Sequence, residues 1–390
     1  MPQAAVIVSG ARTAIGRFGG SLKDVEAHEL GALCIREVLA TTGVEPGEVD
    51  EVVMGQVGQV GPDAYNARRC ALAAGLPPTT TAMNVNRLCS SGLQAIVTAA
   101  QQVQLGDAGI VVAGGDESMS RQPFLDWQAR DGWRLGTHQL VDGTLSLLTD
   151  PWGSYLMGVT AEKVAERYGV DRAEQDRFAA RSQALAQAAL ASGVLDPEIV
   201  AVDVRGRDEP FAQDEHPRAG VTAESLAKLR PAFQEGGTVT AGNSSGINDG
   251  AAALLLMDEA EAERRGLEPR LRFRSWAVTG IEPEVMGYAP AQAIPKAVAR
   301  AGLTLDDIDL IELNEAFAAQ AAAVVRDAGL DEERVNVCGG AIAFGHPVGA
   351  TGAILTVRLM HSLERLGGKF GVVTMCIGGG QGMAAVFERP

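Results

Sequence analysis

The sequence predicts an α/β fold built from two similar halves with a long insertion between them. Apolar segments typical of buried strands alternate with helical patterns, which indicates βαβ units of mostly parallel sheet. Similar stretches recur about 260 residues apart, a spacing that indicates a duplicated unit. The chain has 390 residues, of which 46% are hydrophobic and 21% charged, so it can form two or three folded domains.

The two halves share a plan of strands and glycine-flanked helix starts. "PGEVDEVVMGQV" (46–57) and "LDDIDLIELNEAF" (305–317) both lead from acidic residues into an apolar strand. "AGIVVAGGDESM" (108–119) and "KFGVVTMCIGGGQGM" (369–383) are strands that end in glycines, and "CSSGLQAI" corresponds to "HPVGATGAIL" as a helix start. Strand ends of such halves converge on a shared crevice, where ligands bind.

These repeats define the expected domain boundaries. We place the first half at residues 1–119, completed by about 249–268, and the second half at 269–390. Residues 120–248 match neither half. We expect this insertion to form a loop or lid domain that faces the substrate and contributes to oligomer contacts.

Composition excludes several function classes. The net charge of -16, without a basic stripe, argues against nucleic-acid binding. No basic leader or long apolar segment is present, so we expect a cytoplasmic protein that is not embedded in a membrane. The five cysteines (34, 70, 89, 338 and 376) form no CxxC pair, which favours reduced thiols over a disulfide framework or a metal site.

Cys89 in "VNRLCSSGLQAI" stands between a short strand-like stretch and a helical pattern that stops at Gly106. A cysteine in this position is more often a buried structural residue than a reactive one. A thiol at a helix N-terminus has its pKa lowered by the helix dipole, however. We therefore expect a lowered pKa if Cys89 is a nucleophile.

Three further motifs combine reactive side chains with glycine or a strand end. Asn314 in "LNEAFAAQ" ends a strand, where it could hold a water or a substrate carbonyl, although such residues are usually caps. His346 in "GGAIAFGHPVGATG" could act as a general base, or be structural, and precedes a helix with Gly349 and Gly352 in its first turns. Cys376 in "VVTMCIGGGQGM" precedes glycines whose N–H groups can approach a ligand, or is simply buried beside a turn. Together they supply a nucleophile, its base and a second thiol for carbon chemistry.

Along essentially its whole length the chain resembles the thiolases, which are acyl-CoA C-acyltransferases. The resemblance also rests on "RTAIGRFGG" (12–20), "MGVTAEKVA" (157–165), "KLRPAF" (228–233) and "TVTAGNSSGINDGAAALLLM" (238–257), in this order and spacing. It implies thiolase-like duplicated βαβαβ halves in a layered αβαβα core. It also implies reversible, ping-pong acyl transfer between CoA thioesters: condensation of two acetyl-CoA, or thiolysis of a 3-ketoacyl-CoA.

The resemblance also implies a role for each motif. Cys89 would carry the acyl group as a thioester, His346 would activate it, and Cys376 would remove or return the α-proton. One oxyanion hole would come from His346 with a water on Asn314, and the other from the backbone N–H groups of Cys89 and Gly378. No metal or permanently bound cofactor is implied, because coenzyme A is a substrate and a product.

The ligand contacts implied by the resemblance lie mostly on or near the insertion. Ser245 would contact the pantetheine, and Arg218 and Ser225 the nucleotide end. The implied pocket walls, each equally explained as core packing, are Met157, Met286 and Phe317. A homo-oligomer, dimer or tetramer, is also implied.

One departure from the family pattern concerns chain length. Leu156 stands where members specialised for acetoacetyl-CoA often have His, which favours a broader, degradative range of 3-ketoacyl-CoA as the alternative. A ketoacyl synthase would have two His beside its Cys instead of the second Cys. A non-catalytic acyl-CoA or lipid carrier would lack Cys89, His346 or Cys376, and all three are present.

Overall fold

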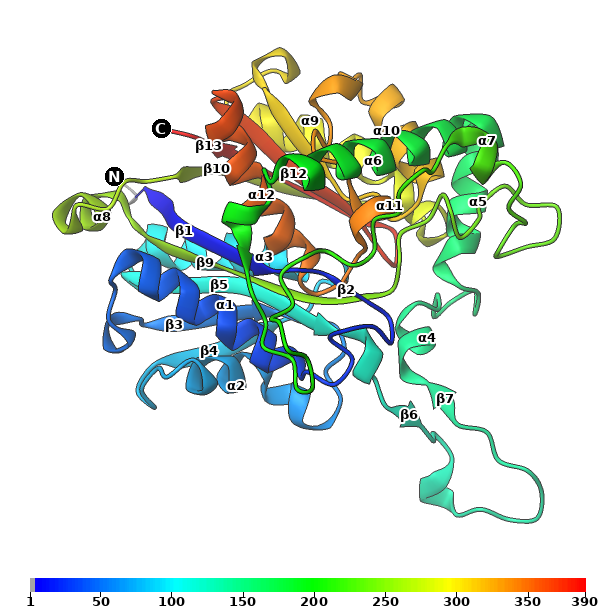
Figure 1. Ribbon diagram of the computed structural model, residues 1–390, viewed down its shortest axis with the longest axis horizontal. Helices are drawn as coiled ribbons and strands as arrows, with labels where there is room; N and C mark the ends of the chain where they lie inside the picture. Colours follow the sequence, from blue (N-terminus) through cyan, green and yellow to red (C-terminus); the bar gives the residue numbers. More distant parts are fainter. Residues whose placement is uncertain (1–3) are drawn as a thin grey trace.

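The two halves of the chain build the two sides of one large sheet. The computed structural model describes residues 4–390, so residues 1–3 of the predicted first half lie outside the described residues. The strands run in the order β11-β12-β13-β10-β1-β9-β5-β3-β4, and the halves meet where β1 pairs with β10 (Figure 1). Their bounds are β1 Ala5–Thr13, β3 Glu51–Gly55, β4 Thr81–Val85, β5 Ile110–Ser118, β9 Asn248–Asp258, β10 Leu271–Gly280, β11 Leu310–Leu313, β12 Phe370–Ile377 and β13 Gln381–Glu388.

The strand directions correct the expected parallel sheet. β3 pairs in parallel with β4 and β5, and β11 with β12. β9 and β13 each insert antiparallel to both of their neighbours. The prediction of a mostly parallel sheet is therefore wrong. A strand joined by a tight turn, as β13 is joined to β12, must run antiparallel, whereas a parallel neighbour needs a long crossover.

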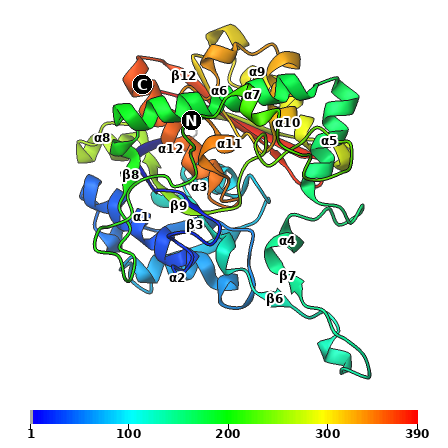
Figure 2. The same ribbon diagram turned by 45° about the vertical axis from the view of Figure 1, so that its right-hand side comes forward.

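Helices sandwich and separate the two half-sheets, which gives five layers (Figures 1 and 2). α1 (Ala27–Thr42) and α2 (Asn66–Ala73) cover the outer face of the first half, and α9 (Pro290–Arg300) and α10 (Ala318–Asp327) that of the second. α3 (Ser91–Leu105) and α12 (Thr351–Leu366) lie between the sheets, in the central apolar core. The predicted layered αβαβα core is confirmed.

The two central helices approach each other at a pair of glycines. A Cβ on Gly92 would lie 2.8 Å from the backbone N of Ala353, and one on Gly352 would lie 2.3 Å from the backbone N of Leu93. Any larger residue would push the helices apart. This close contact brings the N-terminal ends of α3 and α12, which follow Cys89 and His346, to the same region.

The residues between the halves form helices and a protruding arm. β6 and β7 form a narrow two-stranded arm that extends away from the body (Figures 1 and 2). No helix among residues 4–390 is long and apolar enough to span a membrane. The elements here are β6 Phe124–Leu125, β7 Val141–Asp142, α4 Gly143–Leu147, α5 Met157–Tyr168, α6 Arg172–Ser192, β8 Ile199–Val200 and α7 Ala223–Leu226; the other short elements are β2 Gly16–Arg17, α8 Glu259–Arg265 and α11 Ala341–Phe344.

A buried ion network connects the insertion to both halves. Arg12 of β1 donates two hydrogen bonds to Asp214, at 2.8 and 2.9 Å, and contacts Glu198 at 2.6 Å. Arg358 of α12 also contacts Glu198, at 3.1 Å. Because all four side chains are almost completely buried, each charge depends on its partners, and Arg12 holds the pKa of Asp214 below its usual value despite that burial.

Candidate active site

Cys89 lies in a tight turn between β4 and α3. Leu88, the residue before it, has a φ of 47°, a conformation that large side chains rarely adopt. The backbone N of Arg87 donates to Ser91 Oγ (2.9 Å), and that hydroxyl donates to the carbonyl of Leu88 (2.7 Å). The turn therefore presents Leu88 and Cys89 to a cavity rather than to the apolar core.

The pKa of Cys89 is raised, whereas the sequence led us to expect a lowered pKa. Burial raises the pKa of the Cys89 thiol, although hydrogen bonds from the backbone N–H groups of Gly378 and of Cys89 itself favour the thiolate. α3 begins only at Ser91, two residues after Cys89, and burial is the largest influence on the pKa of the thiol. Cys89 is therefore a neutral thiol near pH 7 and requires a base to react.

His346 is held as a neutral imidazole whose Nε2 carries a lone pair and lies 3.4 Å from Nδ2 of Asn314. Its Nδ1 lies 2.7 Å from Thr351 Oγ1, and that hydroxyl donates to the carbonyl of Pro347 at 2.9 Å. Because the hydroxyl proton is used in this way, Nδ1 must carry the hydrogen, and Nε2 keeps its lone pair. Burial lowers the pKa of His346 to about 4, so Nε2 is available as a base at neutral pH.

The loop that carries His346 differs in detail from the expected helix start. α12 begins at Thr351, so Gly349 precedes the helix, and only Gly352 lies in its first turn. The backbone N of His346 donates to Asn248 Oδ1 at 3.0 Å. The side chain is thus fixed from both sides, by β9 through Asn248 and by α12 through Thr351.

Asn314 and Cys376 end neighbouring strands at the same edge of the sheet. Nδ2 of Asn314 lies 3.4 Å from Nε2 of His346, while its buried Oδ1 has no hydrogen-bond partner among the described residues. Cys376 is fully buried, and burial, followed by the negative charge that a Cys89 thiolate would carry, raises its pKa. The two thiols therefore lie close enough to affect each other's ionisation, and Cys376 stays protonated at neutral pH.

The other predicted site residues are those expected to contact coenzyme A. Some of them lie together in the structure, and two lie elsewhere. Met157, Met286 and Phe317 pack in one apolar cluster with Cys376. The backbone N of Ser245 donates to the carbonyl of Ala316 at 2.9 Å, next to this cluster. The contacts described for Arg218 and Ser225 lie elsewhere: Arg218 donates its backbone N–H to Gln183, and Ser225 forms a helix cap with Thr222. Both of these residues are exposed.

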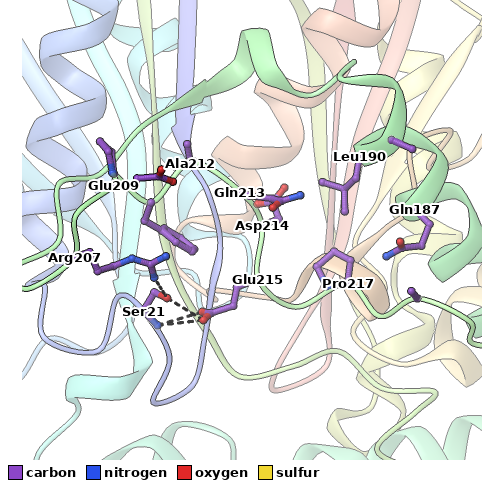
Figure 3. Close-up of a pocket in the computed structure, with 14 residues that line it drawn as sticks. Ser21, Gln187, Leu190, Arg207, Glu209, Ala212, Gln213, Asp214, Glu215 and Pro217 are labelled. Atoms are coloured by element: carbon purple, nitrogen blue, oxygen red, sulfur yellow. Dashed lines mark hydrogen bonds between the residues drawn. The ribbon is translucent and has the colours of Figure 1, made fainter.

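A cavity of about 360 Å³ begins at Cys89, which is within the usual size of a ligand site. A second, wider cavity of about 880 Å³ lies between α6 and the loop 207–219 (Figure 3). Its walls are polar, with Ser21 donating to the Glu215 carboxylate, and none of the predicted site residues lines it. The cavity at Cys89 is therefore the candidate active site. Its walls are Val57, Leu88, Cys89, Ser146, Leu147, Leu148, Thr149, Pro151, Trp152, Met157, Val348, Gly378, Gly379 and Gln381.

A buried carboxylate absent from the predicted site connects these parts. Glu117, at the end of β5, accepts hydrogen bonds from the backbone N–H groups of Val57 (2.9 Å), Gly58 (3.0 Å) and Gly349 (2.9 Å). Glu117 therefore connects Val57, which lines the cavity, to the loop that carries His346. Glu117, Asn248 and Thr351 all stand in motifs singled out in the sequence. Their contacts gave no signal there, because these contacts exist only in the folded chain.

Two family descriptions together match nearly the whole chain: "Thiolase, N-terminal domain" over residues 5–260 and "Thiolase, C-terminal domain" over residues 267–389. The chain belongs to the thiolase family. Relatives include a beta-ketothiolase from Cupriavidus necator, 52% identical over 100% of both chains, and an acetyl-CoA acetyltransferase from Chromobacterium violaceum, 50% identical over 98% of this chain and 99% of the relative.

Solved thiolase structures agree with the fold. The acetyl-CoA acetyltransferase of Bacillus anthracis superposes with a TM-score of 0.97 at 46% identity, covering 100% of this chain and 99% of that one. Human mitochondrial 3-ketoacyl-CoA thiolase superposes with a TM-score of 0.96 at 40% identity, covering 99% of both chains. This thiolase is therefore an acyltransferase, and neither a ketoacyl synthase nor a lipid carrier is favoured.

Proposed function

We propose that this thiolase transfers acyl groups through a thioester on Cys89, with His346 as its base and Cys376 as the acid or base at carbon. The observation that carries the proposal is the protonation pattern. Cys89 is a neutral thiol, His346 is a neutral imidazole with a lone pair on Nε2, and Cys376 is a protonated thiol. Each group is in the state that thiolysis requires before the first step.

In the first half of thiolysis, Sγ of Cys89 attacks the 3-keto carbon while its proton passes to Nε2 of His346. The bond between the α- and β-carbons breaks, and its electron pair forms the enolate of acetyl-CoA. The Cys376 thiol gives its proton to the α-carbon. The shortened acyl group remains on Cys89 as a thioester, and the acetyl-CoA leaves.

In the second half, the sulfur of free CoA attacks this thioester. Before this attack, His346 passes the proton that it took from Cys89 to the Cys376 thiolate. Nε2 of His346 then takes the proton of the CoA thiol and gives it to the departing Cys89 sulfur, so the enzyme regains its starting state. The backbone N–H groups of Cys89 and Gly378 converge on the acyl site and would hold the oxyanion. The unpaired Oδ1 of Asn314 would hold a water that, with His346, stabilises the enolate oxygen.

We propose acyl-CoA thioesters and CoA as the exchanging ligands, with no permanently bound cofactor. The names of the relatives support this assignment, and the human 3-ketoacyl-CoA thiolase was solved in complex with CoA. Ser245 would contact the pantetheine, beside Met157, Met286 and Phe317. Arg218 and Ser225, which are exposed on the insertion, would contact the nucleotide end.

We propose that the protein forms a homo-oligomer in the cytoplasm, dimer or tetramer, with the β6-β7 arm as one contact. The arm exposes large apolar side chains that water would otherwise solvate. They are Phe124, Trp127, Trp133, Leu135 and Leu140. Light scattering of the full chain tests this; a monomer at micromolar concentration would contradict it.

Acetoacetyl-CoA and CoA provide the direct activity test. We expect the enolate absorbance of acetoacetyl-CoA to decay when enzyme and CoA are mixed, with acetyl-CoA as the product. A flat trace at high enzyme concentration, for a correctly folded preparation, would contradict the proposed activity.

A further inference from the structure

We infer that the apolar cavity at Cys89, whose walls are given above, takes the alkyl chain of 3-ketoacyl-CoA substrates longer than acetoacetyl-CoA, with Trp152 as its outer wall. This inference rests on the proposed acyl transfer through Cys89. The acyl group left on Sγ must lie in a space that begins at Sγ, and the cavity does so. The residues that line this cavity, and not Leu156, would then determine which acyl chain lengths the enzyme accepts.

The chemistry of the walls selects the kind of chain. Most of the surface belongs to aliphatic or aromatic side chains, and the polar side chains are Ser146, Thr149 and Gln381. None of the residues that line the cavity carries a charge. An alkyl chain gains free energy by leaving water for such a space, whereas a chain ending in a carboxylate would lose its hydration without a partner. The substrate class is therefore a 3-ketoacyl-CoA with an uncharged alkyl chain.

The position of Trp152 is fixed by a tight turn between α4 and α5. Asp150 is buried, and its Oδ1 accepts hydrogen bonds from the backbone N–H groups of Trp152 (3.0 Å) and Gly153 (2.6 Å). The backbone N of Ser154 donates to the carbonyl of Asp150 at 2.9 Å. The turn therefore fixes the backbone of Trp152 and the point from which its ring projects.

The indole also lies against the glycine loop that follows Cys376. A Cβ on Gly379 would lie 3.3 Å from both Cη2 and Cζ3 of Trp152, and Gly379 has a φ of 83°. Trp152 thus spans from the insertion to the loop that carries Gly378, and it encloses the cavity between them. Leu156 does not line the cavity; it pairs with Thr149 at the base of the turn.

The test compares thiolysis rates along a series of substrates in three proteins. These are the wild type, Trp152→Ala, and the matched control Tyr65→Ala, since both aromatic side chains are 70% exposed but Tyr65 lies outside the cavity. The substrates are acetoacetyl-, 3-ketohexanoyl-, 3-ketooctanoyl- and 3-ketodecanoyl-CoA. For the wild type we expect kcat/KM to rise by about threefold per added methylene over the first steps.

For Trp152→Ala we expect the ratio of kcat/KM for 3-ketooctanoyl-CoA to kcat/KM for acetoacetyl-CoA to fall about tenfold relative to the wild type. Trp152→Phe should recover most of the loss, and Tyr65→Ala should match the wild type throughout. An equal loss for all substrates and for CoA would mean that the cavity holds the pantetheine, and would overturn the inference. So would an unchanged profile. If the wild type fails even with acetoacetyl-CoA, the proposed acyl transfer itself is wrong.

Discussion

Nδ1 of His346 lies 2.7 Å from Oγ1 of Thr351, and this contact places the ring hydrogen on Nδ1 and leaves Nε2 with its lone pair. The Thr351 hydroxyl donates to the carbonyl of Pro347, so towards His346 it is an acceptor. The proposed base, Nε2, therefore depends on a hydroxyl that lies five residues further along the chain.

Replacing Thr351 with Val tests this dependence. Val keeps the shape but removes the acceptor, so Nδ1–H loses its partner and the free-Nε2 tautomer is no longer favoured. We expect kcat for thiolysis to fall about 10- to 100-fold, corresponding to the usual 1–3 kcal/mol for an unpaired buried polar group, with KM little changed. Thr351→Ser should retain most activity. Equal activity of the Val and Ser variants would contradict the assigned role.

The pH profile of acylation follows from the states of His346 and Cys89. Burial lowers the pKa of His346 to about 4, and burial raises that of Cys89. The reactive pair is therefore neutral between these two values. We expect the single-turnover rate of acyl-enzyme formation from acetyl-CoA to be constant from about pH 5.5 to 8. An inflection near 6.5, the ordinary value for histidine, would show that the base is not the buried His346.

Glu117 should matter for both activity and stability. Its two oxygens accept three backbone N–H groups, and the amide of Glu117→Gln would turn an N–H towards at least one of them. We expect a loss of about 1–3 kcal/mol in the free energy of unfolding, together with lower activity as the His346 loop shifts. Chemical denaturation measures the first effect.

The pH dependence of this variant's stability has a defined sign. Burial raises the pKa of Glu117 to about 7 in the folded protein, whereas its pKa in the unfolded chain is near 4.5. The free energy of unfolding of the wild type therefore falls as the pH rises from about 4.5 to 7, because the folded protein holds this proton more tightly. We expect this decline to be smaller in Glu117→Gln. Glu284→Gln, which removes an exposed carboxylate paired with Lys163, should change the free energy of unfolding by less than about 0.5 kcal/mol. A pH dependence identical to that of the wild type would contradict the raised pKa.

Removing Arg12 should break the connection between the insertion and the two halves. In Arg12→Met, Asp214 and Glu198 would remain buried without their main partner. We expect a loss of about 3–5 kcal/mol in the free energy of unfolding, seen as a lower denaturant midpoint. Arg177→Met, which breaks an exposed pair with Glu332, should cost less than about 1 kcal/mol. Similar midpoints for the two variants would contradict a structural role for the buried network.

The spacing of the motifs predicted the repeated halves, and the resemblance to thiolases implied the five layers. The motifs also singled out Cys89, Asn314, His346 and Cys376, whose roles stay predictions. The sequence did not predict that β9 and β13 run antiparallel, since the alternation of strands and helices does not show that β13 turns back along β12 or how β9 enters the sheet after the long insertion. It also predicted the wrong direction for the pKa of Cys89. A helix start is visible in a sequence, whereas the desolvation that raises the pKa depends on which distant residues pack around the sulfur.

Acetylation of Cys376→Ser by acetyl-CoA alone is the most direct test of the proposed division of roles. Peptide mass spectrometry should find the acetyl group on Cys89 at the wild-type stoichiometry, because acylation requires only Cys89 and His346. The same protein should have lost at least about 100-fold in thiolysis of acetoacetyl-CoA, since no thiol remains to protonate the α-carbon. An adduct on another residue, or equal loss of acetylation and thiolysis, would contradict the account.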